Sequence, residues 1–522
     1  IFYRIIIRWN IFAKNNIEFL TFIHIVIAIN FKLYCMQYPW IKKNDIIKNI
    51  KIEKLVFGGK GFARLSHENP ELDGRVIFVT GGAIPGTVAN LRVLKKRKAF
   101  LETQIVEVIE KSPLEVENPN NPYRMSGGWK WINIPYEEQL KIKEEQVRES
   151  LNKILKIQPE LNFLPIQGSP TVDGYRNKVE FSFGKYLSKK YDVEQHFNVG
   201  FHKQGEFSKI EDMEGCPLID EMQNEVYRAV KKFCKTLGLP VYDQMRQEGF
   251  FRHILIRKTH FANEMMLLLS FNPHYFDSNE KLDKAEKLEL IKEFLISLTE
   301  KYSEIKSIYF SHNPNKADVC IGDLELIYGK GSITESLLGL DFQISPTSFF
   351  QTNSTGAEKL YSMVLDFAHK EELKNQTVLD LYGGTGTIGM IFAKHGAKQV
   401  HSVELVTSAS KDGEKNAKLN GIENMSFVNA KVEDFLDKYI EEGNTADLLV
   451  IDPPRAGMHP DALPNILKFG TKQMIYVSCN PATLARDLEY ILTNSEYKIE
   501  KVQAKDMFPH THHIETIVSL VK

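Results

Sequence analysis

The sequence predicts an α/β protein in which a doubly wound, mostly parallel sheet follows a small OB-like β-barrel and a central α+β domain. The parallel sheet is predicted because strand-like and helix-like segments alternate regularly after Gln376, and a glycine-rich turn follows the first strand. The barrel is predicted because apolar and polar residues alternate over residues 46–112 between closely spaced glycine turns. A chain of 522 residues is too long for one hydrophobic core, which favours two or three domains.

The composition is that of an ordinary globular protein, with 43% apolar and 25% charged residues. The formal net charge of −1 at pH 7 excludes a global positive field, so any surface that binds nucleic acid must be local. The five cysteines are Cys35, Cys216, Cys234, Cys320 and Cys479. Their wide spacing and odd number argue against a disulfide framework and fit a reducing compartment, so we expect a cytoplasmic protein.

Residues 1–45 are an atypical extension, and the first 35 of them differ from the rest of the chain. They are rich in Ile, Phe and Asn and contain no Met before Met36. Polar residues such as Glu18 and His24 interrupt the apolar stretch, so it predicts neither a membrane span nor a cleaved signal peptide. We expect translation to begin at Met36, with upstream DNA read in frame before it; the alternative is a genuine N-terminal helix.

The barrel segment contains a cluster of cations, which consists of Arg92, Lys95, Lys96, Arg97 and Lys98. Such a cluster can be a solvated strand edge that is protected by lysines. It can also be a stripe that contacts phosphates on an OB-like barrel. The motifs described below favour the second interpretation, so we expect residues 46–112 to bind RNA.

Residues 113–350 are predicted to form a linker and then the central α+β domain. The expected helices cover residues 136–155, about 218–236 and about 280–301, and the expected strands cover residues 179–183, 254–257, 265–271 and 305–310. Residues 351–522 are predicted to form the parallel-sheet domain, with strands at 377–381, 399–403, 447–451 and 474–478 and a helix that begins at Pro481. Ligands bind such sheets at the carboxyl ends of the strands.

A glycine-rich turn follows the first strand of this domain and predicts a cofactor site. Its glycines allow backbone amides to approach a ligand closely, although the GxGxxG spacing alone is a weak signal. Glu404 ends the next strand, where a carboxylate can accept both hydroxyls of a ribose; the alternative is a strand end that only faces solvent. The arrangement Asp380-Leu-Tyr-Gly-Gly-Thr-Gly386 resembles motif I of class I methyltransferases, which implies S-adenosylmethionine rather than a nicotinamide nucleotide.

Two further segments follow strands of the same sheet. Asp452-Pro-Pro-Arg-Ala-Gly457 would place a carboxylate and a rigid turn beside a transferred methyl group. Methyltransferases that act on amino groups have an aromatic residue where this chain has Arg455, which argues against that class. Cys479 lies at a strand-to-helix turn, where the amides of the helix are expected to lower the pKa of the thiol. A lone cysteine is usually structural, but this polar turn favours a nucleophile.

A third segment, Asp506-Met-Phe-Pro-His-Thr-His-His-Ile-Glu515, ends where a strand begins. Its three histidines have no set of cysteine or carboxylate partners, so we expect them to order the turn and predict no metal site. Cys479 and Glu515 together fit methylation of uracil C5. That carbon is a poor nucleophile, so a thiolate must first add at C6, and a base must later remove the C5 proton.

With these segments the sequence resembles the RNA uracil-C5 (5-methyluridine) methyltransferases, over nearly all residues from Lys48 onward. The segments Ser478–Asp487 and Asp506–Glu515 are highly specific to that family, Gly174–Val179 and Ser348–Asn353 also match, and Leu55–Gly61 resembles its RNA-binding TRAM barrel. The resemblance implies that Cys479 is the nucleophile and Glu515 the proton-abstracting base. It also implies that the S-adenosylmethionine site is lined by Gln351, Tyr382, Glu404 and Asp452.

Many members of that family bind a [4Fe–4S] cluster through four cysteines, three of them just after the barrel. The matching stretch, Asn121–Trp131, contains no cysteine, and Trp129 stands where one is expected. Cys216 remains as a candidate fourth ligand, but one thiolate cannot hold such a cluster. We therefore expect no iron–sulfur cluster.

The resemblance favours ribosomal RNA, 23S rRNA in particular, as the substrate, because a TRAM-like barrel accompanies the large-subunit enzymes more often than the tRNA enzyme. One alternative is the same reaction on a tRNA uridine. Another is a non-catalytic RNA-binding factor that retains the fold, against which the complete catalytic motifs argue. The expected partner is structured RNA, and no membrane is expected.

Overall fold

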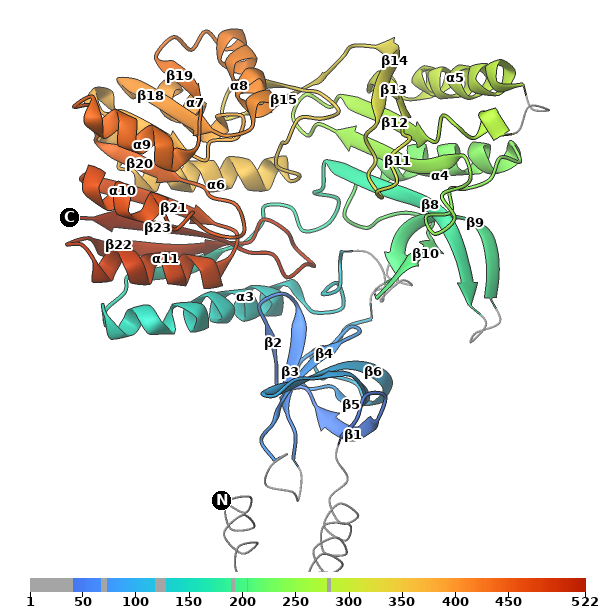
Figure 1. The fold of residues 1–522 in the computed structure, drawn as a ribbon, viewed down its shortest axis with the longest axis horizontal. Helices are drawn as coiled ribbons and strands as arrows, with labels where there is room; N and C mark the ends of the chain where they lie inside the picture. Colours follow the sequence, from blue (N-terminus) through green and yellow to red (C-terminus); the bar gives the residue numbers. More distant parts are fainter. Residues whose placement is uncertain (1–40, 67–72, 118–127, 189–192, 204, 279–282) are drawn as a thin grey trace, which may run out of the picture. The chain divides into compact units, whose positions relative to one another are not determined.

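The computed structural model describes residues 41–66, 73–117, 128–188, 193–203, 205–278 and 283–522 (Figure 1). The expectations for residues 1–35 and Met36 lie outside these described residues. Backbone contacts divide the described chain into two units. One runs up to Val56 and resumes at Lys60–Leu114, and the other comprises Phe57–Gly59 and Glu115–Lys522. No helix among the described residues is long and apolar enough to cross a membrane.

The first unit is a six-stranded sheet in the order β1-β5-β6-β4-β3-β2. Its strands are β1 (Ile46–Lys51), β2 (Lys54–Val56), β3 (Lys60–Arg64), β4 (Val76–Thr80), β5 (Val88–Lys96) and β6 (Phe100–Glu110). Side chains alternate between buried and partly exposed positions, and Ile77 and Leu91 are fully buried. No ladder joins the edge strands β1 and β2 among the described residues. The β-rich unit is therefore confirmed, but the closed barrel is not.

The predicted cation cluster lies at the end of β5 and in the turn toward β6. The side chain of Lys95 is 62% exposed and contacts Glu102 at 3.8 Å. The guanidinium of Arg75 donates to the carbonyl oxygens of Arg97 and Lys98, both at 2.7 Å. These bonds fix the backbone of the turn and leave the side chains of Arg97 and Lys98 exposed to solvent.

The central part of the second unit is a seven-stranded sheet in the order β10-β9-β8-β11-β12-β13-β14. Its strands are β8 (Lys178–Ser188), β9 (Val193–Lys203), β10 (Glu206–Asp212), β11 (Phe251–Lys258), β12 (Met265–Phe271), β13 (Ile305–His312) and β14 (Asp323–Gly329), and its helices are α4 (Glu221–Thr236), η2 (Phe276–Ser278) and α5 (Lys284–Lys301). Apolar residues of α4 and α5 share one core with β8, β11, β12 and β13. Asp220 begins α4 with a capping box, in which its carboxylate accepts from the Gln223 amide at 2.9 Å.

The C-terminal part is an eight-stranded sheet in the order β19-β18-β17-β20-β21-β23-β22-β7. Its strands are β7 (Phe163–Gln167), β17 (Thr377–Leu381), β18 (Gln399–Glu404), β19 (Met425–Asn429), β20 (Leu448–Ile451), β21 (Gln473–Ser478), β22 (Lys498–Lys505) and β23 (Glu515–Val521). The strands from β19 to β21 are parallel, whereas β23 is antiparallel to both β21 and β22. The strand order reverses at β17, which opens a crevice at the carboxyl ends of the neighbouring strands.

Helices cover both faces of this sheet (Figure 1). They are α3 (Tyr136–Ser150), η1 (Leu151–Lys156), α6 (Ser354–Phe367), η3 (Lys370–Asn375), α7 (Thr387–Lys394), α8 (Thr407–Leu419), α9 (Val432–Glu441), α10 (Ala462–Phe469) and α11 (Pro481–Thr493), and a hairpin of β15 (Ile333–Leu337) and β16 (Leu340–Ile344) precedes α6. Val378 of β17 packs into the core with α6, α7 and α8, and Leu379 packs into the core with α3, α9, α10 and α11. The α/β class is thus confirmed, with apolar strand residues buried on both faces.

Two elements differ from the prediction. The helix expected at 136–155 ends at Ser150 and continues as the 3₁₀ segment η1, and the Ser150 hydroxyl donates to the Gln146 carbonyl at 2.7 Å. The strand β7 was not predicted, because Pro165 and a short apolar run are weak strand signals. It pairs in parallel with β22 at the edge of the sheet, where a proline is tolerated.

Candidate active site

A cavity of ≈ 1120 Å³ opens at the carboxyl ends of β17, β18, β20 and β21, and all six residues singled out from the sequence line it. They are Gln351, Tyr382, Glu404, Asp452, Cys479 and Glu515. Strand register explains part of this convergence, because Leu381 of β17 pairs with both Val403 of β18 and Ile451 of β20. The residue that follows each of these three positions therefore reaches the same edge of the sheet.

The antiparallel strand β23 brings the two proposed catalytic residues together. Ser478, at the end of β21, pairs with Thr516, near the start of β23. Cys479 and Glu515, the next residues beyond that pair, therefore lie at the same edge. Glu515 is 8% exposed and Cys479 is partly buried, and both face the cavity described above.

The glycine-rich turn after β17 allows a close approach of backbone to side chains. A Cβ atom at Gly383 would lie 2.1 Å from the Ser402 hydroxyl oxygen and 2.7 Å from Asp380 Oδ2. Asp380 is fully buried, and its Oδ2 accepts from the Ser402 hydroxyl at 2.9 Å and the Gly389 amide at 3.1 Å. Burial raises the pKa of Asp380 to about 6. The Oδ1 atom of Asp380 has no partner among the described residues, so a polar group remains available beside the cavity.

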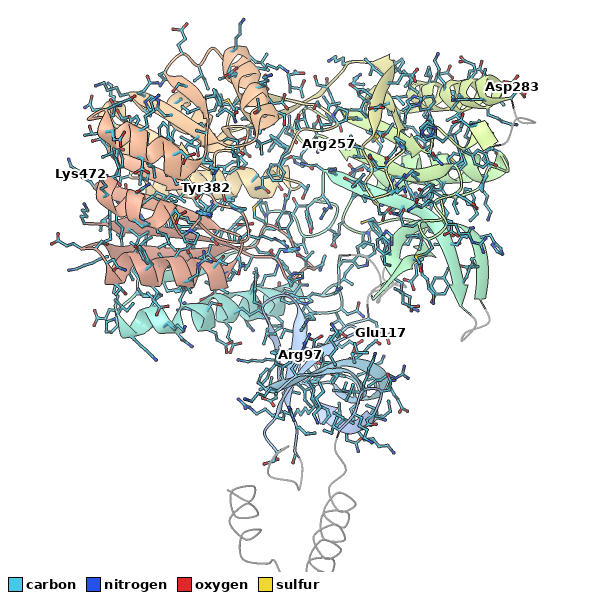
Figure 2. All side chains as sticks on the ribbon, viewed as in Figure 1. Arg97, Glu117, Arg257, Asp283, Tyr382 and Lys472 are labelled. Carbon is cyan, nitrogen blue, oxygen red and sulfur yellow. The ribbon has the colours of Figure 1, made fainter. Side chains whose placement is uncertain are left out.

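Glu404 is held at the end of β18 by backbone amides. Its Oε2 accepts from the Gly384 amide at 3.0 Å, and its Oε1 accepts from the Val406 amide at 2.7 Å. Each oxygen keeps a second lone pair, so the fixed carboxylate can still accept two hydroxyl groups. Tyr382, labelled in Figure 2, takes a positive φ of 61° at the strand end. The fixed carboxylate, the compact turn and the unpartnered Asp380 oxygen fit a bound S-adenosylmethionine.

Gln351 lies in a loop that the central sheet holds in place. The side chain of Arg257, on β11 (Figure 2), donates to the carbonyl of Ser345 at 3.0 Å and to that of Ser348 at 3.1 Å. The amide side chain of Asn177 donates to the Gln351 carbonyl at 2.9 Å. The two sequence segments around Asn177 and Gln351 are therefore in direct contact. The same loop exposes Phe349, 71% accessible, at the cavity, a residue that the sequence reasoning did not single out.

Asn480 joins the turn that contains Cys479 to the loop that contains Asp452. Its side-chain oxygen caps α11 by accepting from the Ala482 amide at 3.1 Å, and its side-chain nitrogen donates to the Arg455 carbonyl at 2.9 Å. This capping fixes the direction in which the chain enters α11. The Asn480 side chain thus connects the backbone of the loop after β20 to the start of α11.

Asp487, on α11, forms hydrogen bonds with β21 and with the loop after β20. It is fully buried and accepts hydrogen bonds from the Tyr476 hydroxyl at 2.7 Å, the Met458 amide at 2.9 Å and Arg486 Nε at 2.8 Å. A buried acidic residue seven positions into a helix gives no sequence signal of its own. Its place in the Ser478–Asp487 segment was the available indication, and no role was assigned to it.

The environment of Cys479 differs from the expectation. Burial, together with the negative charges of Glu515 and Asp452, raises the pKa of the Cys479 thiol to about 11. The predicted lowering by helix amides is therefore wrong for this structure. Burial is the largest cause, followed by the charges of Glu515 and Asp452. Arg455, which hydrogen-bonds the cysteine, offsets them only in part.

The carboxyl groups around Cys479 also favour their neutral forms. Burial, and then the charge of Asp452, raises the pKa of Glu515 well above its ordinary value, while Arg455 opposes this shift. Burial and the charge of Asp380 raise the pKa of Asp452 to about 7. A positive charge bound in the cavity would oppose these shifts and favour the charged forms of the carboxyl groups.

Arg455 is the cation of this cluster, and the sequence reasoning used it only to exclude a class of enzyme. Its guanidinium lies 2.7 Å from Nδ1 of His513. Burial and nearby positive charge lower the pKa of His513 to about 3, so a neutral imidazole can accept a hydrogen bond from Arg455. This contact connects the Asp506–Glu515 segment to the loop after β20.

The same segment is anchored to α3. His510 Nδ1 lies 3.0 Å from Gln139 Nε2, its amide donates to Gln139 Oε1 at 2.8 Å, and its Nε2 lies 3.0 Å from Asp173 Oδ1. Lys143 and Asp506 form a fully buried ion pair at 2.7 Å. Within the described ranges, no group of three or more His, Cys, Asp or Glu residues could hold a metal ion.

Trp129 and Cys216 both lie in the core of the central sheet, each 2% exposed. The Trp129 ring packs edge-on against Phe201, with 5.4 Å between ring centroids. The Cys216 amide donates to the Asn224 side chain at 2.8 Å, and burial raises the pKa of its thiol to about 11. Residues 121–127 lie outside the described ranges, and the absence of an iron–sulfur cluster stays a prediction.

Known proteins resemble this chain along most of its length. Residues 324–522 match the family model described as tRNA (Uracil-5-)-methyltransferase. An uncharacterized RNA methyltransferase of Caldanaerobacter subterraneus is 37% identical, over 92% of this chain and 99% of its own length. Another, from Clostridium tetani, is 39% identical, over 90% of this chain and 96% of its own.

One solved structure covers nearly the same range. The Pyrococcus abyssi tRNA (uracil-54, C5)-methyltransferase in complex with S-adenosyl-L-homocysteine is 27% identical, with a TM-score of 0.67, and the match covers 91% of this chain and 100% of that chain. The range matched by the family model includes the glycine-rich turn and the segments around Cys479 and Glu515. The chain therefore belongs to the RNA uracil-5-methyltransferase family and is an S-adenosylmethionine-dependent RNA (uracil-C5)-methyltransferase.

Proposed function

We propose that this enzyme methylates C5 of a uridine in ribosomal RNA, and that the substrate is 23S rRNA. The reaction passes through a covalent bond between Cys479 and uracil C6. The observation that carries the proposal is that Cys479, Glu515 and the four residues expected to bind the cofactor line one cavity. S-adenosylmethionine would supply a methyl group on a positively charged sulfonium, and Gln351, Tyr382, Glu404 and Asp452 would hold it.

The first step is attack by the Cys479 sulfur on C6. The thiol must first transfer its proton to solvent water, because a thiol with a pKa of about 11 is protonated at neutral pH. Arg455, which hydrogen-bonds Cys479, stabilises the thiolate, and a positive ligand in the cavity does so further. As the sulfur–C6 bond forms, the electron pair of the C5–C6 double bond moves onto the C4 carbonyl oxygen. The resulting enolate makes C5 nucleophilic.

Glu515 acts after C5 has gained its methyl group. In its carboxylate form it accepts the C5 proton, and the electron pair left on C5 re-forms the double bond and expels the Cys479 thiolate. Burial raises the pKa of Glu515 well above its ordinary value, which makes its carboxylate a stronger base. The same shift means that Glu515 must lose its own proton before it can act, and Arg455 favours that loss.

The β-rich first unit presents an exposed cation cluster around Lys95 and Arg97, which supports RNA binding. Ribosomal RNA is proposed because this unit resembles a TRAM barrel, which accompanies the large-subunit enzymes more often than the tRNA enzyme. In this proposal residues 46–112 act as a TRAM-like RNA-binding domain, residues 113–350 as linker and central domain, and residues 351–522 as the methyltransferase domain. The second candidate is the same reaction on a tRNA uridine. It is favoured by the structural relative, which is a tRNA (uracil-54, C5)-methyltransferase.

The test compares unmodified 23S rRNA and tRNA transcripts as substrates of the full chain with radiolabelled S-adenosylmethionine. We expect label in 23S rRNA, recovered as 5-methyluridine, and none with Cys479→Ala. Cys234→Ala is the matched control, since Cys234 lies in α4 and does not line the catalytic cavity. Label confined to tRNA would overturn the rRNA assignment, and full activity of Cys479→Ala would overturn the mechanism.

A further inference from the structure

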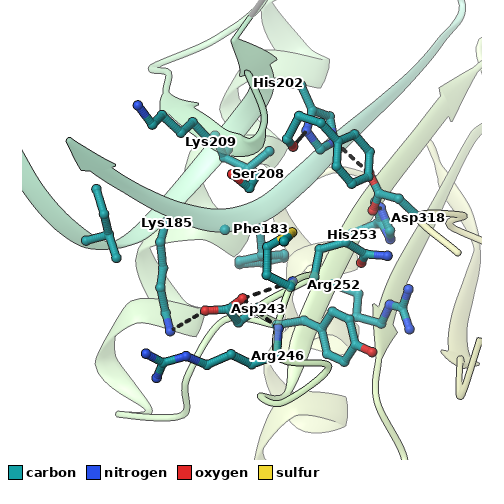
Figure 3. A pocket seen from close by; sticks show the side chains of 17 residues that line it. Phe183, Lys185, His202, Ser208, Lys209, Asp243, Arg246, Arg252, His253 and Asp318 are labelled. Atoms are coloured by element: carbon teal, nitrogen blue, oxygen red, sulfur yellow. Dashed lines mark hydrogen bonds and ion pairs between the residues drawn. The ribbon is translucent and has the colours of Figure 1, made fainter. Parts of the chain in front are cut away.

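A second pocket lies in the central sheet and shares no lining residue with the catalytic cavity. Its volume is ≈ 230 Å³, and it is formed by β8, β9, β10, β11 and the loop at residues 242–246. In the view of Figure 3, Lys185, Asp243 and Arg246 lie toward one side, and His202, His253 and Asp318 lie toward the other. The catalytic mechanism uses none of these residues.

The pocket exposes two large apolar side chains. Phe207 is 56% exposed and Met245 is 74% exposed. The Phe207 ring stacks on the imidazole of His202, with 5.1 Å between centroids and 4° between planes. An aromatic ring that is supported on one face and open to solvent on the other is a platform on which a planar group can stack.

Buried polar side chains line the interior of the pocket. Asp318 bridges two histidines, with Oδ2 at 2.6 Å from His202 Nε2 and Oδ1 at 3.1 Å from His253 Nε2. The side chain of His253 is 6% exposed, and its Nδ1 has no partner among the described residues. Arg252 is 2% exposed, and its Nε likewise has no partner there. Two buried nitrogens in residues that line the pocket therefore lack a hydrogen-bond partner among the described residues.

One cation at the rim remains available for an anion. Lys185 is paired with Asp243 at 3.2 Å. The Asp243 carboxylate also accepts from the amides of Met245 at 3.0 Å and Arg246 at 3.1 Å, which fixes the loop. The side chain of Arg246 is exposed and makes no ion pair with any described residue. A guanidinium in that position is suited to a phosphate group.

We propose that this pocket binds one unpaired nucleotide of the RNA substrate, with the base stacked on Phe207 and the adjacent phosphate on Arg246. Stacking requires a base that is splayed out of a helix, which is how proteins usually recognise RNA loops. Asp318 and the two histidines that it bridges form the polar wall of the pocket beside the base. The assignment of an RNA ligand rests on the proposed function. The pocket would then be a second RNA contact, outside the catalytic cavity.

The test measures binding of an unmodified 23S rRNA transcript, and of a short single-stranded oligoribonucleotide, to the full chain over a range of salt concentrations. We expect Phe207→Ala to weaken binding about tenfold. We expect Arg246→Gln to weaken binding and to lower the salt-dependence slope by about 1. For both variants, kcat at saturating RNA stays at the wild-type value. The matched controls are Phe261→Ala, at a 44% exposed aromatic residue outside the pocket, and Lys235→Gln on α4.

The outcomes separate this proposal from the proposed function. Wild-type affinity in both Phe207→Ala and Arg246→Gln, in an enzyme that still methylates RNA, would overturn the pocket assignment alone. Methylation by Cys479→Ala would overturn the mechanism, while weakened oligonucleotide binding in Phe207→Ala would still support the pocket. Binding of free 5′-AMP that Phe207→Ala abolishes, with RNA affinity unchanged, would assign the pocket to a free nucleotide and contradict the RNA assignment.

Discussion

The thiol of Cys479 should behave, in the protein without RNA, as a protonated thiol that is hard to ionise. Its pKa of about 11 results from burial and from the charges of Glu515 and Asp452. With that pKa, about one thiol in a thousand is a thiolate at pH 8. We therefore expect the rate of alkylation by iodoacetamide to rise about tenfold for each pH unit between about pH 7 and pH 10, without a plateau. Mass spectrometry of the Cys479 peptide measures this rate.

Substitution of the neighbouring charged residues tests what raises the pKa of Cys479. Glu515→Gln removes a group whose negative charge raises the pKa of Cys479, so alkylation should become faster above the pH at which Glu515 ionises. Arg455→Gln removes the opposing cation, so the pKa should rise and alkylation should become slower. Glu489→Gln is the matched control, because Glu489 is an exposed carboxyl group on α11 outside the catalytic cavity. A plateau below about pH 8.5 in the wild-type protein would contradict a raised pKa of Cys479.

Four further predictions concern stability, the cofactor and iron. Asp487→Asn should lower the free energy of unfolding by about 1–3 kcal/mol in urea titrations, because a buried acceptor of three hydrogen bonds loses its charge and one acceptor oxygen; unchanged stability would contradict this. Lys143→Met should cost about 3–5 kcal/mol by leaving Asp506 buried and unpaired, and Lys143→Met with Asp506→Leu should recover part of that loss. Glu404→Gln should weaken S-adenosylmethionine binding in calorimetry without unfolding the protein, and equal affinity would exclude Glu404 from the site. Protein purified anaerobically should lack stoichiometric iron and sulfide, because Cys216 alone cannot hold a cluster.

The sequence predicted the elements whose signal is local. The strand at 265–271 coincides with β12, a continuous apolar run that is buried at every position. Strand β7 was missed because its main stabilisation is a pairing with β22, more than three hundred positions later in the chain. The predicted barrel closure likewise depends on whether β1 pairs with β2, and no pairing between them is present in the described part of the first unit.

The site was predictable to the extent that sheet geometry determines it. Residues that follow parallel strands meet at one edge, so Glu404, Asp452 and Cys479 could be brought together from their positions in the sequence. The sign of the Cys479 shift could not be predicted in this way, because it depends on how close the carboxylates lie and on how much solvent they keep. The contact of Arg455 with His513 joins two segments that no local pattern relates.

In the proposed mechanism the Cys479 sulfur forms a covalent bond to the uracil ring. The most direct measurement uses RNA that contains 5-fluorouridine, together with S-adenosylmethionine, because fluorine cannot leave C5 as a proton does and the covalent complex persists. We expect a denaturation-resistant protein–RNA complex whose RNA is attached to the peptide that contains Cys479, and no such complex with Cys479→Ala. A complex attached through another residue, or methylation of normal RNA at the wild-type rate by Cys479→Ala, would contradict it.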